Sequence, residues 1–203
     1  MNKASRSVNT EIPVRPGEGF ELVSERRQTV ETDGKSSLAF SFRLADAPAP
    51  DRRYVTDVYS VHPSVEGCKF LFAQEKIGGG LRSLLVIHLS DEAVYRFVES
   101  TGTVSNWSIS GSTNAADAPI RIEQEPDQTV AFRANAVAVA VANGESCMDF
   151  YQMSAFSLHA VQNGGKLQMT QLVRVEMRTG QFFGLLRDLE RLGFKPKAHK
   201  VMS

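Results

Sequence analysis

The sequence predicts an α+β protein in which one antiparallel sheet-plus-helix unit occurs twice. Short stretches of apolar residues alternate with polar ones, as in strands that are buried on one face. Two of these stretches lead directly into segments whose apolar residues recur at helical spacing. The order strand, strand, strand, helix therefore occurs once within residues 20–102 and again within residues 119–195.

The two units align over a strand and the following helix at a constant offset of 88 residues. The matched pairs are Leu85 with Val173, Ile87 with Val175, Leu89 with Met177, Val94 with Phe182 and Phe97 with Leu185. Cys68 and Cys147 are 79 apart, so on this alignment the hairpin absorbs the remaining 9 residues, as loops commonly do. The alternative is that any two β-meanders followed by a helix would align this well by chance.

The composition is that of an ordinary globular protein, with 42% hydrophobic and 23% charged residues in 203. This length allows one sizeable core shared by both units. No stretch approaches the roughly 18 consecutive apolar residues of a membrane span, and residues 1–16 lack the apolar run of a secretory signal. We expect a flexible arm at 1–19, no membrane partner and an intracellular location in the cytoplasm or an organellar matrix.

The two cysteines are too few for a disulfide framework. The four histidines, at 62, 88, 159 and 199, are widely spaced and give no metal-ligand cluster. We therefore expect free thiols, no metal site and no small-molecule cofactor.

The first unit divides at clear turn and cap signals. We expect strands at 20–31, 37–44, 54–62, 68–74 and 84–89. Pro63 ends the third of these, and the glycines at 78–80 close a hairpin. The glycine run could also cradle a phosphate, but it does not lead into a helix. Ser90 caps a helix at 91–101, which Gly102 ends.

A polar, small-residue segment at 103–118 is expected to link the units, with Trp107 as a packing anchor or a ligand-stacking ring. In the second unit, 131–143 alternates valine with alanine and predicts a strand whose smooth alanine face is a packing surface. Strands at 147–152 and 172–177 and a helix at 180–192 follow, with a long loop at 155–166. Residues 196–203 are expected to be a basic tail.

The repeated unit resembles the PUR repeat and, more loosely, the Whirly-type fold. The resemblance covers about residues 37–102 and 120–193. It rests on DVYSV at 57–61, EGCKFLFAQE at 66–75, RSLLVIHLS at 82–90 and AVYRF at 93–97. It implies two ββββα repeats that form an intramolecular pseudo-dimer, whose sheets bind single-stranded RNA or DNA without catalysis.

The residues of this sequence that match the implied binding surface come from the first unit. They are Lys69, Gln74, Lys76 and Arg82, with Tyr59 as a stacking ring. On the cysteine alignment the second unit has Met148 at the lysine position, and it has Gly184 where the first has Arg96. We therefore expect the first unit to bind the ligand and the second to support the assembly.

Charge argues against nucleic-acid binding, because the chain carries 23 basic and 23 acidic side chains. A local patch of Arg52, Arg53, Lys69, Lys76 and Arg82 could still be basic. The alternative is an oligomeric scaffold or chaperone-like subunit that uses the alanine-faced strand, loosely similar to SecB-type export chaperones. In both cases we expect a homo-oligomer. No nucleophile has an evident base partner, so an enzyme is not expected.

Overall fold

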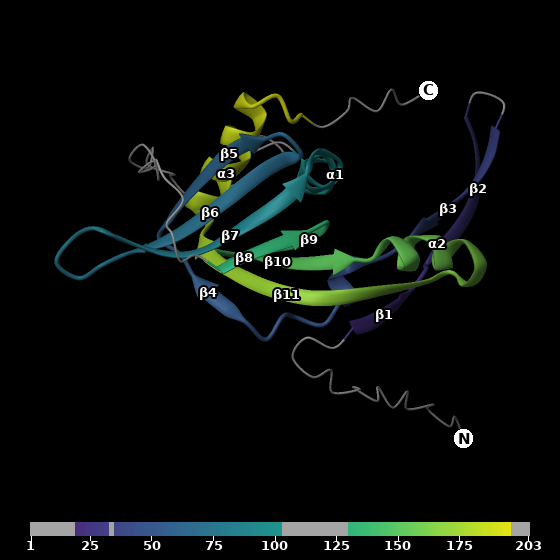
Figure 1. The fold of residues 1–203 in the computed structure, drawn as a ribbon, viewed down its shortest axis with the longest axis horizontal. Helices are drawn as coiled ribbons and strands as arrows, with labels where there is room; N and C mark the ends of the chain where they lie inside the picture. The colour runs from purple at the N-terminus through teal and green to yellow at the C-terminus, as the bar shows by residue number, and fades with distance from the viewer. Residues whose placement is uncertain (1–18, 33–34, 103–129, 196–203) are drawn as a thin grey trace, which may run out of the picture.

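A computed structural model describes residues 19–32, 35–102 and 130–195 and has an α+β fold, as expected (Figure 1). The helices are α1 (Asp91–Thr101), α2 (Ala155–Gly164) and α3 (Thr179–Arg191), and η1 (Leu44–Asp46) is a single 3₁₀ turn. The strands are β1 (Gly19–Val23), β2 (Arg26–Thr32), β3 (Lys35–Ser41), β4 (Arg53–Val55), β5 (Val58–Ser64), β6 (Gly67–Glu75), β7 (Leu81–Ser90), β8 (Val130–Ala134), β9 (Ala136–Ala142), β10 (Glu145–Met153) and β11 (Lys166–Arg178).

Two sheets make up most of the fold. The first sheet has the order β5-β6-β7-β8, and the second has the order β1-β11-β10-β9, with β4 also paired to β11. The hairpin of β2 and β3 forms a separate two-stranded sheet that extends away from both (Figure 1). All neighbours within the two main sheets are antiparallel except two pairs, β4 with β11 and β7 with β8.

These two parallel pairs connect the halves of the chain. Strand β4 comes before the first hairpin but pairs with β11 of the second half, placing Tyr54 opposite Val175. Strand β8 comes before the second hairpin but pairs with β7 of the first half, placing Phe132 opposite Ile87. Each half therefore supplies strands to the sheet of the other: β4 and also β1 go to the second sheet, and β8 goes to the first.

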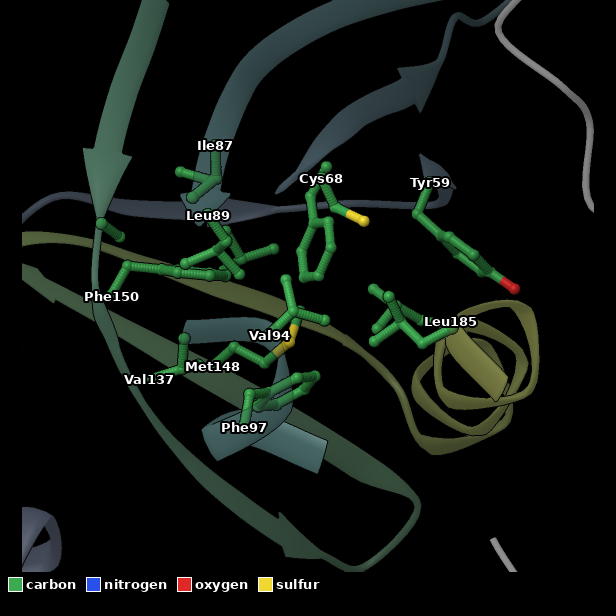
Figure 2. Packing of buried hydrophobic residues seen from close by; sticks show 14 of the residues in the cluster. Tyr59, Cys68, Ile87, Leu89, Val94, Phe97, Val137, Met148, Phe150 and Leu185 are labelled. Carbon is green, nitrogen blue, oxygen red and sulfur yellow. The ribbon is translucent and has the colours of Figure 1, made fainter. Parts of the chain in front are cut away.

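One hydrophobic core joins both sheets to α1 and α3 (Figure 2). Phe72 of β6 and Phe150 of β10 meet near its centre, with ring centroids 6.4 Å apart and solvent excluded from both. Phe97 of α1 approaches Phe182 of α3 at 6.5 Å. A smaller second cluster surrounds Tyr151 at the far end of β10 and β11. Burial of these large rings is the main stabilising contribution.

The hairpins β6-β7 and β10-β11 match each other closely, but not at the register expected from the cysteines. Each hairpin has a β-bulge, after Phe72 in β6 and after Phe150 in β10. Matching these bulges aligns β6 with β10 at an offset of 78 residues. At this shift Cys68 corresponds to Ser146, and Lys69 corresponds to Cys147 rather than to Met148. Because Phe72 pairs with Leu85 and Phe150 with Val173, the offset of 88 holds for β7 and β11.

Three expected strands are divided in the structure. The segment 20–31 breaks at Ser24 and Glu25, and 54–62 breaks after Val55. The valine-alanine segment breaks at Asn135, whose side chain hydrogen-bonds the backbone N–H and C=O of Met153 at 2.7 and 2.8 Å. The Asn135 contacts allow β8 to pair in the first sheet and β9 in the second. Pro63 lies inside β5, because an edge strand tolerates the missing N–H.

The connection at 155–166 was expected to be a loop, but it contains α2. Ser154 caps this helix by accepting a hydrogen bond from the Ser157 N–H at 3.0 Å, and Gly165 ends it in the left-handed conformation. Helix α1 has the expected bounds, with Ser90 as its cap. The expected linker at 103–118, including Trp107, and the tail at 196–203 lie outside the described residues. So does the arm, except that Gly19 already begins β1.

Candidate nucleic-acid interface

Four basic or imidazole side chains form one row across the outer face of the first sheet. The strand register places His62 opposite Lys69, Lys69 opposite His88, and His88 opposite Arg133. We call these four residues the basic row. They lie on the outer face, which is the side of the sheet opposite the core that Phe70, Ile87 and their neighbours at alternate positions fill. Leu71 and Val86, further along this face, are buried. With strands about 4.8 Å apart, the row spans about 14 Å.

His62 and Arg133 of the basic row each contact a neighbouring polar residue. The Ser60 hydroxyl and Nε2 of His62 are 2.7 Å apart, so the buried serine orients the imidazole. Arg133 and Glu66 form an ion pair at 3.5 Å, with 76% and 77% of their side chains exposed. At this exposure the ion pair adds little stability, since water screens both charges. Arg133 can therefore exchange Glu66 for another anion at small cost.

A cavity of about 240 Å³ adjoins the Arg133 end of the basic row. Its lining joins β7, β8, β10 and the β5-β6 turn, and comprises Ser64, Glu66, His88, Leu89, Ser90, Arg133, Ala134, Asn135 and Gln152. We call it the row-end cavity. Leu89 and Ala134 are buried apolar residues in this lining. Most of the other residues carry hydrogen-bonding groups, so the cavity offers both donors and acceptors.

Tyr59 is not available as a stacking ring, contrary to the expectation. Only 4% of the residue is exposed, and Figure 2 shows its side chain extending toward α3. Its hydroxyl donates a hydrogen bond to Oδ2 of Asp188 at 3.2 Å. Burial, followed by the charge of Asp188, raises the pKa of Tyr59 above its ordinary value of 10.0. Tyr59 therefore fixes α3 against the first sheet.

The other four expected residues fall into two groups. Lys69 belongs to the basic row, whereas Gln74 pairs directly with Arg82 at the opposite end of the hairpin. Lys76 lies just beyond, in the turn that follows β6. Lys69 and Gln74 are five positions apart along β6, about 17 Å at the usual rise per residue. The structure thus separates Lys69 from the residues with which the sequence grouped it.

The second sheet has a different set of side chains at the positions that correspond to the basic row. By the shifts of 78 and 88 residues, the corresponding residues are Ala140, Cys147, Glu176 and Val55. This set contains no cation and includes one acid. Beside it, Asp149 and Arg174 form a bidentate pair with both N···O distances at 2.6 Å. The second sheet therefore has no counterpart of the basic row, although the exposed Arg53 lies opposite Arg174 on the same face.

Part of the alanine face is covered by the chain itself. Strand β9 contacts η1, and Ala136, Ala138, Leu44 and Ala47 all pack against the smaller cluster around Tyr151. The Tyr151 hydroxyl donates to the carbonyl of Pro48 at 3.2 Å. The small side chains allow this backbone to approach, as a packing surface should. Ala140 and Ala142 remain exposed.

Neither thiol has the environment of a reactive cysteine. Burial raises the pKa of Cys68 to about 11, and burial also raises that of Cys147. A raised pKa suppresses the thiolate, which is the nucleophilic form. Within residues 19–32, 35–102 and 130–195, no cluster of three or more His, Cys, Asp or Glu side chains is arranged to hold a metal ion. In the same residues, no helix is long and apolar enough to cross a membrane.

Sequence reasoning missed His62, His88, Arg133 and Gln152. Only the strand register brings them together, because Arg133 comes from a strand that crosses from the other half of the chain. The alternation of the strands could have placed His88 on the face of Lys69, but the parallel pairing of β7 with β8 has no local signal.

Comparisons with known proteins found no matching family model, curated relative or solved structure.

Proposed function

We propose that the protein binds single-stranded RNA or DNA, without catalysis, on the outer face of the first sheet. The observation that carries this proposal is the basic row, His62, Lys69, His88 and Arg133, in register across four strands. Lys69 and Arg133 supply the positive charge of this row, and the His88 ring lies between them. Phosphates that bind to these cations would release condensed counterions, which favours binding.

A single strand fits this face better than a duplex. A single strand can follow a row of side chains on a sheet and turn its bases toward the protein, whereas duplex readout requires an element that enters a groove. Imidazole rings and the Arg133 guanidinium are planar groups on which unstacked bases can rest. The absence of cations at Ala140, Cys147, Glu176 and Val55 restricts the proposed binding to one face per chain.

For the fold, we propose a pseudo-dimer of two ββββα repeats and a distant relationship to the PUR and Whirly-like families. The reciprocal pairing of β4 and β8 with the opposite half supports the pseudo-dimer. Matching backbone contacts support it further. The side chain of Asp57 accepts a hydrogen bond from the Glu75 N–H at 3.3 Å. The side chain of Asn135 accepts the equivalent hydrogen bond from the Met153 N–H. Asn135 follows Asp57 by 78 residues, and Met153 follows Glu75 by the same offset.

A homo-oligomeric scaffold is the second candidate function, and the edge strand β9 favours it. No described strand pairs with the outer edge of β9, whose sequence AVAVAVA carries no charge or proline. The corresponding strand β5 contains Pro63 at the position of Val141, and this proline prevents edge pairing. The unprotected edge would allow a second copy to pair there.

The proposed function can be tested by fluorescence anisotropy with mixed-sequence single-stranded RNA and DNA and with duplex DNA. We expect binding to the single strands that weakens steeply between about 50 and 200 mM salt. Lys69→Ala with Arg133→Ala should lower the affinity and reduce the magnitude of the salt slope by about 1.4, or about 0.7 per phosphate contact.

The matched control is Lys76→Ala with Arg82→Ala, which removes the same number of cations from the other end of the hairpin. This control should retain the affinity of the unsubstituted protein. Equal losses in the two double variants would show a general charge effect and contradict the basic row.

A further inference from the structure

We infer that the row-end cavity holds one unstacked nucleobase of the strand that crosses the basic row. This inference rests on the proposed function and specifies how the same site takes its ligand. The cavity adjoins the row directly, since His88 and Arg133 belong to both.

The size of the cavity selects a small ligand group. Its volume of about 240 Å³ lies below the roughly 300 Å³ at which pockets for drug-sized ligands begin. A single ring system is therefore a better match than a complete dinucleotide cofactor. Leu89 and Ala134 also line the cavity, although both belong to the hydrophobic core.

The chemistry of the lining selects a base over a phosphate. Glu66 brings a carboxylate to the wall, and its negative charge opposes a phosphate inside the cavity. A base edge instead presents donors and acceptors together, which match the amide of Gln152 and the hydroxyl of Ser64.

The Asn135 side chain forms part of the wall but is committed to the fold. Both its amide nitrogen and its amide oxygen are bonded to the backbone of Met153. Gln152 is exposed and lies next to this contact, at the position that corresponds to Gln74 in the first half. Gln152 is thus the side chain best placed to hydrogen-bond a base edge, and Gln74 is its natural control.

The experiment compares one mixed-sequence DNA strand with the same strand carrying abasic sites, which keep the phosphates but lack the bases. We expect the full-length protein to bind the intact strand at least about fivefold more tightly, the lower limit for one protein-bound base. Gln152→Ala should reduce this ratio toward one, while Gln74→Ala leaves it unchanged. Ser64→Met, which places a larger side chain at the cavity, should reduce the ratio in the same way.

The outcomes separate this inference from the proposed function. Equal binding of intact and abasic strands would overturn the inference and leave polyanion binding intact. An unchanged ratio in both Gln152→Ala and Ser64→Met, with melting temperatures like that of the unsubstituted protein, would also overturn it. No binding of either strand at low salt would overturn the proposed function itself.

Discussion

The hydroxyl of Tyr59 on β5 donates a hydrogen bond to Asp188 on α3 at 3.2 Å, joining residues 129 positions apart in the sequence. The contact requires Gly184, because a side-chain carbon at that position would overlap the Tyr59 hydroxyl. The glycine of α3 that replaces Arg96 of α1 is thus explained by packing.

Gly184→Ala is expected to destabilise the protein by about 1–3 kcal/mol, since the buried hydroxyl must move. Tyr59→Phe should cost about 1 kcal/mol through the lost hydrogen bond. In the double variant, Tyr59→Phe removes the hydroxyl oxygen that an alanine side chain at position 184 would overlap. Alanine also favours the helix more than glycine does. The double variant should therefore be at least as stable as Tyr59→Phe alone in urea unfolding. Additive losses would contradict the proposed overlap.

The ion pair of Asp149 and Arg174 gives a second stability prediction. Asp149 is 7% exposed, so Asp149→Asn should cost about 3 kcal/mol by leaving a partly buried guanidinium without its partner. The corresponding positions of the first sheet hold Leu71 and Val86. Asp149→Leu with Arg174→Val should therefore recover most of the loss. Thermal unfolding monitored by circular dichroism would measure both, and a double variant less stable than Asp149→Asn would contradict this expectation.

Glu66→Gln is expected to strengthen nucleic-acid binding. It removes the exposed carboxylate that pairs with Arg133 and lowers the negative charge at the row-end cavity. The gain should be about two- to fivefold at low salt, in line with the small value of an exposed pair. Glu99→Gln on α1 is a control of equal charge change, and a similar gain there would indicate a general effect of net charge.

Stability should fall as the pH rises above about 9. Burial raises the pKa values of Tyr59 and Tyr151 above 10.0 and that of Cys68 to about 11. The unfolded chain loses these protons at lower pH than the folded chain, so alkali favours unfolding. Urea titrations from about pH 8 to 11 should show this decline. Tyr151→Phe should flatten the decline, whereas Tyr95→Phe, at a partly exposed ring, should leave it unchanged.

Self-association through β9 can be tested with a substitution that the first half already contains. Val141→Pro copies Pro63 and should preserve the fold while blocking pairing at the edge. In sedimentation velocity, we expect a concentration-dependent oligomer for the unsubstituted chain and a monomer for Val141→Pro. A monomer in both samples would rule out pairing through β9.

The sequence predicted elements with strong local signals more reliably than the strand pairings. The helix that begins after Ser90 has the expected bounds, because its cap, apolar stripe and terminal glycine all lie within a few residues. Helix α2 was missed because its apolar residues form no clear stripe, although Ser154 and Gly165 mark its two ends. Of the candidate site, the sequence identified Lys69 but could not place Arg133 beside His88.

The exchange of β4 and β8 means that neither half contains all the strands of its own sheet. A chain cut between residues 102 and 130 would give two fragments, and the one that carries Lys69 would lack Arg133. Completing the basic row would then become a bimolecular event, governed by the concentration of both fragments. In the intact chain the same step is intramolecular, so covalent linkage of the halves assembles the candidate site at any dilution.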